Sequence, residues 1–557
     1  MIFREANRRL SRRPAVHVET LVLLAAVFLM LVCNGPFWRG ALAGRSWQEP
    51  VTWGFAAAMF IGFSAFYVAF AAAISIRYTV KPLLTALLLV SAAAGYYMER
   101  YSVFFDRTML ANVLATNYKE ASELLGWRLL VHLLVFGVLP SLLVWWPTLK
   151  RRSFGRAIAL RLAWVAVAIG VAVASLLLVF ADFASLMRNH SEVRYLLTPG
   201  NVVAAAIGNA VGRASRPDQP KIVVGADAKA GPAWQSRTRP TLLVLVVGET
   251  ARAQNFSLNG YARPTNPELA RRGVINFADT QSCGTSTEVS LPCMFSPFGR
   301  RHYDEDQILT HESVLQVLAR AGFKVLWRDN QSGCKGVCDG LPTEQVDHGG
   351  PGALCAGGEC LDELLLRGMD GIVRDTRGNL VVVMHQLGSH GPAYFKRYPP
   401  AFKRFVPACE FEDLRLCKQE EIVNAYDNSL LYTDFVLGQV IDFLERAQQT
   451  HDTAMLYISD HGESLGEKGL YLHGVPWAIA PDVQKKVPFV VWLSPAFQRD
   501  IGIDAGCMRG RARQPASHDN LFHSLLGVLD VQTSVYDASM DIFAGCRRPV
   551  TAAGTRP

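Results

Sequence analysis

The apolar residues divide the chain into two parts. Five apolar runs, at about residues 18–37, 51–76, 80–98, 127–147 and 157–181, are each long enough to cross a bilayer as a helix, which takes roughly 20 residues. Almost no amphipathic stretch separates them, which argues against buried helices of a large soluble core. The first run lacks a convincing small-residue cleavage site and more runs follow it, so we expect a retained span and not a signal peptide.

A different pattern follows the fifth run. Residues 183–212 mix apolar and polar positions, which predicts short helices lying on the membrane surface. The prolines and glycines of residues 213–240 indicate a linker. We therefore predict a five-helix transmembrane domain over residues 1–181, surface helices and a linker over 182–239, and a catalytic domain over 240–557.

The third region alternates short apolar runs with longer helical stretches, which predicts an α/β domain with a mostly parallel sheet between helices. Strands buried on both faces appear as continuous apolar runs. The strand candidates are Leu242–Val247, Phe323–Trp327, Leu380–Met384, Ala454–Ser459 and Val487–Leu493. The helix candidates span about 312–321, 361–373, 420–447 and 518–529.

Charge gives the membrane orientation. The formal net charge is +8, and much of the excess stands beside the apolar runs. Positively charged loops stay in the cytoplasm, so the N-terminus is expected inside and everything after about residue 182 outside. No basic patch interleaved with aromatic residues occurs in the soluble half, and we expect no nucleic-acid partner. The inside residues are Arg4, Arg8, Arg9, Arg12, Arg13, Arg77, Lys81, Lys150, Arg151, Arg152 and Arg156.

The cysteines agree with this orientation. Of 11 cysteines, Cys33 lies in the first span and the other ten lie in the outside domain. An even set of close pairs in an oxidising compartment predicts disulfides, and a cysteine zinc site is the alternative. Proximity along the chain gives the pairs Cys283 with Cys293, Cys334 with Cys338, Cys355 with Cys360, Cys409 with Cys417, and Cys507 with Cys546.

Polar residues follow four of the predicted strands. In parallel sheets ligands bind at the carboxyl ends of strands, so these residues are expected to converge on one site. Glu249, Asp460 and His461 combine carboxylate and imidazole ligands, which suit Zn²⁺ or a similar first-row metal. Three protein ligands leave a position for a catalytic oxygen. Helix capping is the alternative role for Glu249 and for Asp460. Capping is a good explanation for either residue alone, but a poor one for Glu249, Asp460 and His461 taken together.

A hydroxyl-rich stretch supplies candidates for a nucleophile. Thr285, Ser286 and Thr287 follow Gly284 in the segment 283–293. A helix starting there would direct its free N–H groups at a phosphate, and a metal or base would activate the hydroxyl. Spacing alone does not choose among the three, and a plain Ser/Thr-rich turn is the alternative.

These motifs together resemble the phosphoethanolamine–lipid transferases of Gram-negative inner membranes, which include lipid A-modifying and colistin-resistance enzymes. The likeness spans nearly the whole chain and implies a catalytic domain of the alkaline phosphatase/sulfatase fold. The matching segments are Val247–Arg252, Asn259–Tyr261, Ser282–Thr287, Ser290–Ser296, Asp329–Gly336, Gly388–Pro392 and Ser459–Gly466.

The resemblance assigns roles to individual residues. It implies that Thr287 is the nucleophile and joins Glu249, Asp460 and His461 around one zinc. His390 and His473 match positions that hold the transferred phosphate, allow a second zinc and serve proton transfer. Lys335 matches a phosphate contact, and Glu463 matches a further substrate-site position. In the loop after the third span, Asn112, Thr116 and Glu120 recur every four residues, so one helix face would carry them toward the head group; a solvated face is the alternative.

The implied reaction moves phosphoethanolamine from phosphatidylethanolamine to a lipid A phosphate by a ping-pong mechanism through Thr287. It would lower the negative surface charge and protect against polymyxin. A monomer is expected, because nothing in the sequence requires an oligomer. The alternatives are transfer to a lipopolysaccharide core sugar or another glycan, a phosphoglycerol transferase, phosphodiesterase or sulfatase, and a non-catalytic membrane receptor or scaffold.

Overall fold

The computed structural model describes residues 13–116, 118–214, 220–346, 354–356 and 359–547. Its contacts divide the chain into two compact units. Unit 1 holds residues 1–110 and 125–209, and unit 2 holds residues 111–124 and 210–557. A short segment between the third and fourth apolar runs thus belongs to unit 2. Each unit is described separately below.

Unit 1 is helical. Among the described residues, four helices are long and apolar enough to cross a membrane, or five if a bent pair counts as one span. The bent pair joins Val18–Cys33 to Gly35–Ala41 at 66°, so the first apolar run is not one straight helix. The four others are α4 (Pro50–Ile74), α5 (Val80–Tyr101), Trp127–Trp145 and α10 (Phe154–Leu178).

Helices α4 and α10 pack closely because small residues face one another. A Cβ atom placed on Gly62 of α4 would lie 3.4 Å from Ser175 Cβ of α10. Small side chains let helix backbones approach in this way within a membrane. The other face of α10 is apolar and exposed: Leu162, Val167 and Leu177 each keep more than 60% of their surface. Such a face suits hydrocarbon and not water.

Unit 2 is built on an eight-stranded sheet with the order β15-β5-β14-β11-β4-β10-β6-β7. Only β14 runs antiparallel to its neighbours, which confirms the predicted mostly parallel sheet. The strands are β15 (Ala516–Ser517), β5 (Ile275–Gln281), β14 (Lys486–Leu493), β11 (Asp452–Ser459), β4 (Thr241–Gly248), β10 (Leu380–His385), β6 (Lys324–Asp329) and β7 (Thr343–Gln345).

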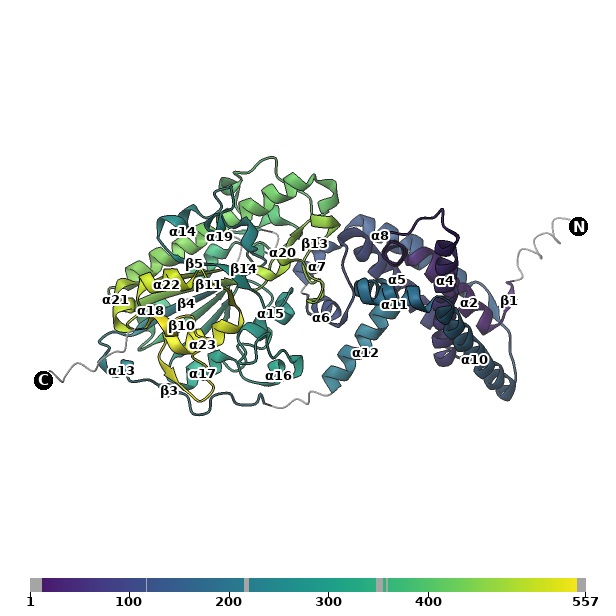
Figure 1. Ribbon diagram of the computed structural model, residues 1–557, viewed down its shortest axis with the longest axis horizontal. Helices are drawn as coiled ribbons and strands as arrows, with labels where there is room; N and C mark the ends of the chain where they lie inside the picture. Colours follow the sequence, from purple (N-terminus) through teal and green to yellow (C-terminus); the bar gives the residue numbers. More distant parts are fainter. Residues whose placement is uncertain (1–12, 117, 215–219, 347–353, 357–358, 548–557) are drawn as a thin grey trace, which may run out of the picture. The chain divides into compact units, whose positions relative to one another are not determined.

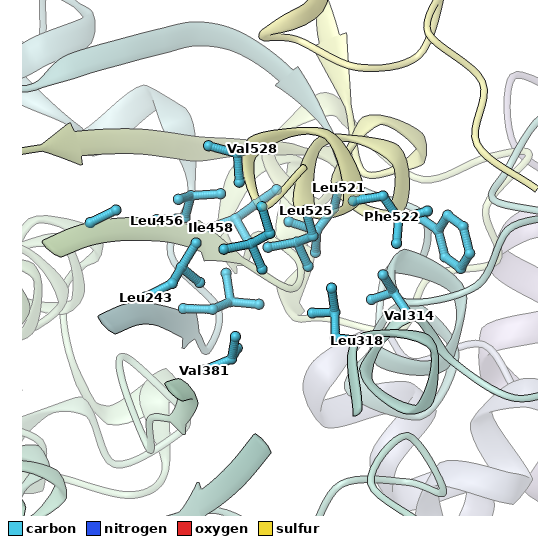
Figure 2. Close-up of a cluster of buried hydrophobic side chains, with 14 of the residues drawn as sticks. Leu243, Val314, Leu318, Val381, Leu456, Ile458, Leu521, Phe522, Leu525 and Val528 are labelled. Carbon is cyan, nitrogen blue, oxygen red and sulfur yellow. The ribbon is translucent and has the colours of Figure 1, made fainter. Parts of the chain in front are cut away.

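The central strands are buried on both faces. Along β4, Leu243 and Leu245 belong to one apolar cluster, whereas Leu242 and Val244 belong to the cluster on the other face. Helix α19 (Gln419–Ala447) lies on the opposite side of the strands from α17 (Val314–Arg320) and α23 (Asp519–Val528) (Figure 1). Residues of α17 and α23 contact the strand residues of the first cluster (Figure 2). This arrangement explains the uninterrupted apolar runs in the sequence.

Three local predictions need correction. Strand β5 was not predicted, because Asn276, Asp279 and Gln281 interrupt its apolar pattern. The helix expected at about 361–373 is a 3₁₀ turn (Asp362–Leu366) and a separate helix α18 (Met369–Asp375), because Gly368 between them has φ +81°. Asn112, Thr116 and Glu120 do not lie on one continuous helix, because α6 (Arg107–Ala115) ends before Thr116 and α7 (Tyr118–Leu124) begins after it. The Thr116 N–H still donates to the Asn112 carbonyl at 2.9 Å, as in a helical turn.

Five disulfides staple unit 2. They join Cys283 to Cys293, Cys334 to Cys338, Cys355 to Cys360, Cys409 to Cys417, and Cys507 to Cys546. These are the pairs predicted from proximity in the sequence. Cys33, in unit 1, is a buried free cysteine.

Candidate active site

Parallel strand register brings the polar strand ends together. Ser459 of β11 pairs with Gly248 of β4, and His385 of β10 pairs with Val247 of β4 and with Asp329 of β6. The residues that follow these strands therefore emerge at one edge of the sheet. Glu249 follows β4, and Asp460 and His461 follow β11. Helix α15 (Thr287–Met294) adds the threonine at its first position.

Four side chains converge at this edge. Thr287 Oγ1 lies 3.1 Å from Glu249 Oε2 and 3.3 Å from His461 Nε2. His461 Nε2 lies 3.3 Å from both Glu249 Oε1 and Asp460 Oδ2. All four side chains are at least 94% buried. One potential ligand atom from each of Glu249, Asp460 and His461 lies within 4.8 Å of the others, a spacing that a single metal ion could bridge.

The hydrogen bonds leave suitable ligand atoms available. His461 Nδ1 donates to the Gly462 carbonyl at 2.9 Å, which directs Nε2 at the cluster. Asp460 Oδ1 accepts the N–H groups of Thr250 and His461, whereas the buried Oδ2 accepts no hydrogen bond from any described residue. Neutral imidazole and ionised carboxylate are metal-binding forms, and their other atoms are oriented by further hydrogen bonds. These donors fit a divalent metal ion.

The electrostatics of the two carboxylates also favour a divalent metal ion at this cluster. Burial opposes ionisation of Glu249, but the hydrogen bond and charge of His461, with the charges of His390 and His473, outweigh it and hold the pKa of Glu249 well below its usual range. Burial and the nearby Glu249 carboxylate raise the pKa of Asp460 to about 6. Two carboxylates this close need positive charge between them, and a divalent cation supplies it.

Unusual backbone conformations hold Glu249 in place. The next residue, Thr250, has φ +55°, a region that threonine rarely adopts. Tyr426 donates from its hydroxyl to the Thr250 carbonyl at 2.6 Å and supports this conformation. Gly388, at φ +54°, passes so close that a Cβ atom there would lie 2.6 Å from the Glu249 carbonyl oxygen. A larger residue at 388 would displace Glu249.

The three hydroxyls left open by the sequence differ in their surroundings. Thr287 Oγ1 points to Glu249 and His461, as described above. Thr285 Oγ1 donates to the Val475 carbonyl at 2.7 Å and is thus engaged elsewhere. Ser286 is the N-cap residue of α15, but its buried hydroxyl caps nothing and makes no hydrogen bond among the described residues. Only Thr287 contacts the proposed metal ligands.

A small open cleft within unit 2 reaches Thr287. It brings together most of the predicted substrate residues. Lys335 Nζ lies 3.5 Å from Glu288 Oε2, beside the start of α15. The side chain of Glu120 lies outside the described residues. The lining residues are Asn112, Ala115, Thr116, Thr287, Gln331, Ser332, Lys335, His390 and His473.

Glu463 stands behind the cleft instead of lining it. Its Oε2 accepts from His473 Nδ1 at 2.9 Å, and its Oε1 accepts from the Tyr394 hydroxyl at 2.6 Å. The carboxylate thus orients His473 and presents its other ring nitrogen to the cleft. The His473 ring centre is 4.4 Å from that of His461 and 5.7 Å from that of His390.

Sequence reasoning missed Gln331 as a site residue. Its Nε2 donates to Glu249 Oε2 at 2.8 Å, so it orients a proposed metal ligand directly. The residue lies within the recognised segment Asp329–Gly336, yet a glutamine among polar neighbours carries no chemical signal of its own. Only the tertiary contact reveals its partner.

Comparisons with known proteins agree with this geometry. The family model described as Sulfatase matches residues 241–531, and the one described as Phosphoethanolamine transferase EptA/EptB matches residues 62–213. The phosphoethanolamine transferase EptA of Escherichia coli K12 is 39% identical over 546 residues, covering 97% of this chain and 99% of the relative. Phosphatidylethanolamine transferase Mcr-1 of Escherichia coli is 40% identical over 427 residues, covering 75% of this chain and 79% of the relative.

A solved structure extends the likeness to the whole fold. The integral membrane protein lipooligosaccharide phosphoethanolamine transferase A of Neisseria meningitidis superposes with a TM-score of 0.92 at 35% identity. The match covers 96% of this chain and all of that chain. Its helical apolar region, its sulfatase-like domain and its full-length relatives place this chain in the phosphoethanolamine transferase family.

Proposed function

We propose that this enzyme transfers phosphoethanolamine from phosphatidylethanolamine to a phosphate of lipid A through a phosphoethanolamine-threonine intermediate on Thr287. The observation that carries the proposal is the position of Thr287 Oγ1, which lies at a helix start and within 3.3 Å of both Glu249 and His461. The relatives' activity supports the transferred group, and a more distant relative at 26% identity is a Kdo(2)-lipid A phosphoethanolamine 7''-transferase.

Glu249, Asp460 and His461 would hold a zinc ion, with Thr287 as the fourth ligand. The ion would lower the pKa of the threonine hydroxyl and offset negative charge on the phosphoryl oxygens. Carboxylate and imidazole donors with no thiolate suit zinc at a catalytic site. The resemblance also allows a second zinc near His390 and His473.

In the first half-reaction, Thr287 Oγ1 bonds to the phosphorus of the donor lipid as the bond from phosphorus to the diacylglycerol oxygen breaks. The Thr287 hydroxyl proton is released to water, because the depressed pKa of the nearby Glu249 makes that carboxylate a weak base. His473, oriented by Glu463, donates a proton to the departing diacylglycerol oxygen. Lys335 and the N–H groups at the start of α15 bind the phosphoryl oxygens.

In the second half-reaction, a phosphate oxygen of lipid A bonds to the same phosphorus. The bond between phosphorus and Thr287 Oγ1 breaks, and the threonine recovers its proton. Asn112 and Thr116, which line the cleft, bind the ethanolamine head group together with Glu120. The product carries a cationic amine over an anionic phosphate, which weakens the binding of polycationic peptides such as polymyxin.

The apolar helices would anchor the enzyme in the bacterial inner membrane with unit 2 in the periplasm. There oxidising conditions maintain the five disulfides. We propose that a monomer is sufficient, because every proposed catalytic residue comes from one chain.

Mass spectrometry of lipid A from cells expressing the enzyme tests the proposal. The wild type adds the mass of phosphoethanolamine, and Thr287→Ala reduces transfer by at least about a thousandfold. Ser286→Ala is the matched control, because its hydroxyl makes no hydrogen bond among the described residues and its loss leaves transfer near the wild-type level. Equal modification by the wild type and Thr287→Ala would rule out Thr287. Phosphoethanolamine found on core sugars but not on lipid A would overturn the acceptor.

A further inference from the structure

A buried histidine lies between the nucleophile segment and the metal-binding segment, and no role has yet been given to it. His518 precedes helix α23 and has 0% of its surface exposed. Its backbone is anchored, because β15 pairs with β5 and the His518 N–H donates to the Gln281 carbonyl at 2.9 Å. The imidazole ring is therefore held at the end of β5, next to Ser282 and Cys283.

Each ring nitrogen of His518 binds a different segment of the site. Nδ1 accepts the N–H of Cys283 at 3.1 Å, four residues before Thr287. Nε2 lies 2.9 Å from the carbonyl oxygen of Ser459, the residue before Asp460. A peptide N–H can only donate and a carbonyl can only accept, so Nδ1 is unprotonated and Nε2 carries the proton. Burial lowers the pKa of His518 to about 3, which agrees with this neutral form.

Ser290 forms a second link between the same two segments. Its hydroxyl donates to the Asp460 carbonyl and accepts the Gly284 N–H at 3.2 Å. The hydroxyl oxygen also lies 3.3 Å from His518 Nδ1. The loop that carries the nucleophile is thus tied at both ends to the strand end that carries Asp460 and His461.

We propose that His518 is a positioning residue that holds the Cys283–Thr287 loop at a set distance from the Ser459–His461 segment and so directs the Thr287 hydroxyl at its proposed partners. The imidazole ring is rigid, so its two nitrogens keep the two segments a constant distance apart. Misplacing a reacting atom by about 1 Å can reduce a rate by about a hundredfold. This inference rests on the proposed role of Thr287.

Two substitutions of His518 each remove one of its two hydrogen bonds and keep a group for the other. His518→Asn places an amide near the position of Nδ1 and keeps an acceptor for Cys283, but it cannot reach Ser459. His518→Gln reaches toward Ser459 with an N–H donor, but loses the acceptor for Cys283. His523→Gln is the matched control: His523 is a buried histidine within helix α23, and its Nδ1 accepts from the Asp537 N–H, away from the site.

The test uses the full-length protein in detergent with a fluorescent phosphatidylethanolamine and lipid A. It measures kcat, KM, zinc per protein and the unfolding temperature. We expect each His518 variant to lower kcat by about 10- to 100-fold, with KM within about twofold and zinc content unchanged. The control His523→Gln should keep the wild-type kcat even where its unfolding temperature falls. Hydrogen exchange of residues 282–294 should accelerate in His518→Gln and stay closer to the wild type in His518→Asn.

Three results would overturn the inference: a kcat within threefold of the wild type in both variants, a kcat loss matched by His523→Gln at equal thermal destabilisation, or a loss that zinc depletion accounts for. Thr287→Ala is assayed alongside. Its full activity would defeat the proposed nucleophile, whereas an inactive Thr287→Ala beside fully active His518 variants would defeat the positioning role alone. If His518→Gln does not accumulate as folded protein, His518→Asn decides by the same criteria.

Discussion

At the scale of single residues, the hydrogen bonds that a side chain already makes determine which of its atoms remain available to bind a metal. Asp460 Oδ1 accepts hydrogen bonds from two backbone N–H groups, and Oδ2 remains available to the cluster. His461 Nδ1 donates to the Gly462 carbonyl, and Nε2 remains directed at the cluster. The side-chain types alone predict a metal site, but only these contacts identify the ligand atoms.

Gln331 provides a test at this scale. Its amide donates to Glu249 Oε2, and groups that orient metal ligands typically change metal affinity by about 10- to 100-fold when they are removed. We expect Gln331→Ala to weaken zinc binding by that amount and to lower activity at limiting zinc. Competition with a zinc chelator on the purified protein measures the affinity.

Gln449→Ala serves as the control for this measurement, because Gln449 is an exposed glutamine beyond the end of α19. Its zinc affinity should equal that of the wild type. An unchanged affinity in Gln331→Ala would show that Glu249 needs no support from this side chain.

At the scale of elements, helix α15 places the nucleophile. The helix begins at Thr287, and the disulfide between Cys283 and Cys293 spans its first turns. A helix start offers unpaired N–H groups and positive potential to a phosphate. The sequence contained the hydroxyls, the glycine and the cysteines of this segment, but the helix start at Thr287 emerges from the fold.

The disulfides allow a test of this element. Replacing Cys283 and Cys293 by alanine opens a loop with a sequence separation of 10, whereas replacing Cys507 and Cys546 opens one with a separation of 39. Chain entropy predicts that the second pair contributes about 1 kcal/mol more to the free energy of unfolding. We expect the first double variant to lose more activity per folded molecule and the second to lose more stability.

Denaturant unfolding and kcat, measured on both double variants under the same conditions, check this expectation. The Cys507/Cys546 variant is the control, because that disulfide joins Cys507 of α22 (Ala505–Arg511) to Cys546 and neither cysteine borders the cleft. Equal kcat losses in the two variants would show that the first disulfide does not specifically order the nucleophile segment.

At the scale of the whole molecule, apolar and basic residues together predict the topology. Exposed apolar side chains on α10 suit a membrane span, and basic clusters are predicted on the cytoplasmic side. With epitopes at both termini, a protease added to intact spheroplasts should remove the C-terminal epitope and leave the N-terminal one. Both epitopes should disappear after lysis. Loss of the N-terminal epitope before lysis would contradict the proposed orientation.

The sequence by itself determined the features that depend on local pattern. Continuous apolar runs located the membrane helices and the core strands, because spans and doubly buried strands need uninterrupted apolar side chains. Close cysteine pairs determined the disulfides, because proximity along the chain limits the partners. The types of residue at strand ends, with the resemblance, indicated the metal and transferase chemistry.

The tertiary structure alone decided the features that depend on contacts distant in sequence. Polar residues interrupt the apolar pattern of strand β5, so the sequence does not reveal that strand. The four-residue spacing of Asn112, Thr116 and Glu120 suggests one helix, but α6 and α7 are separate helices. Gln331 and His518 have no chemical signature in the sequence, and they gain meaning through Glu249, Cys283 and Ser459. A hydrogen bond between such residues exists only once the sheet has brought their strands together, so no local pattern can encode it.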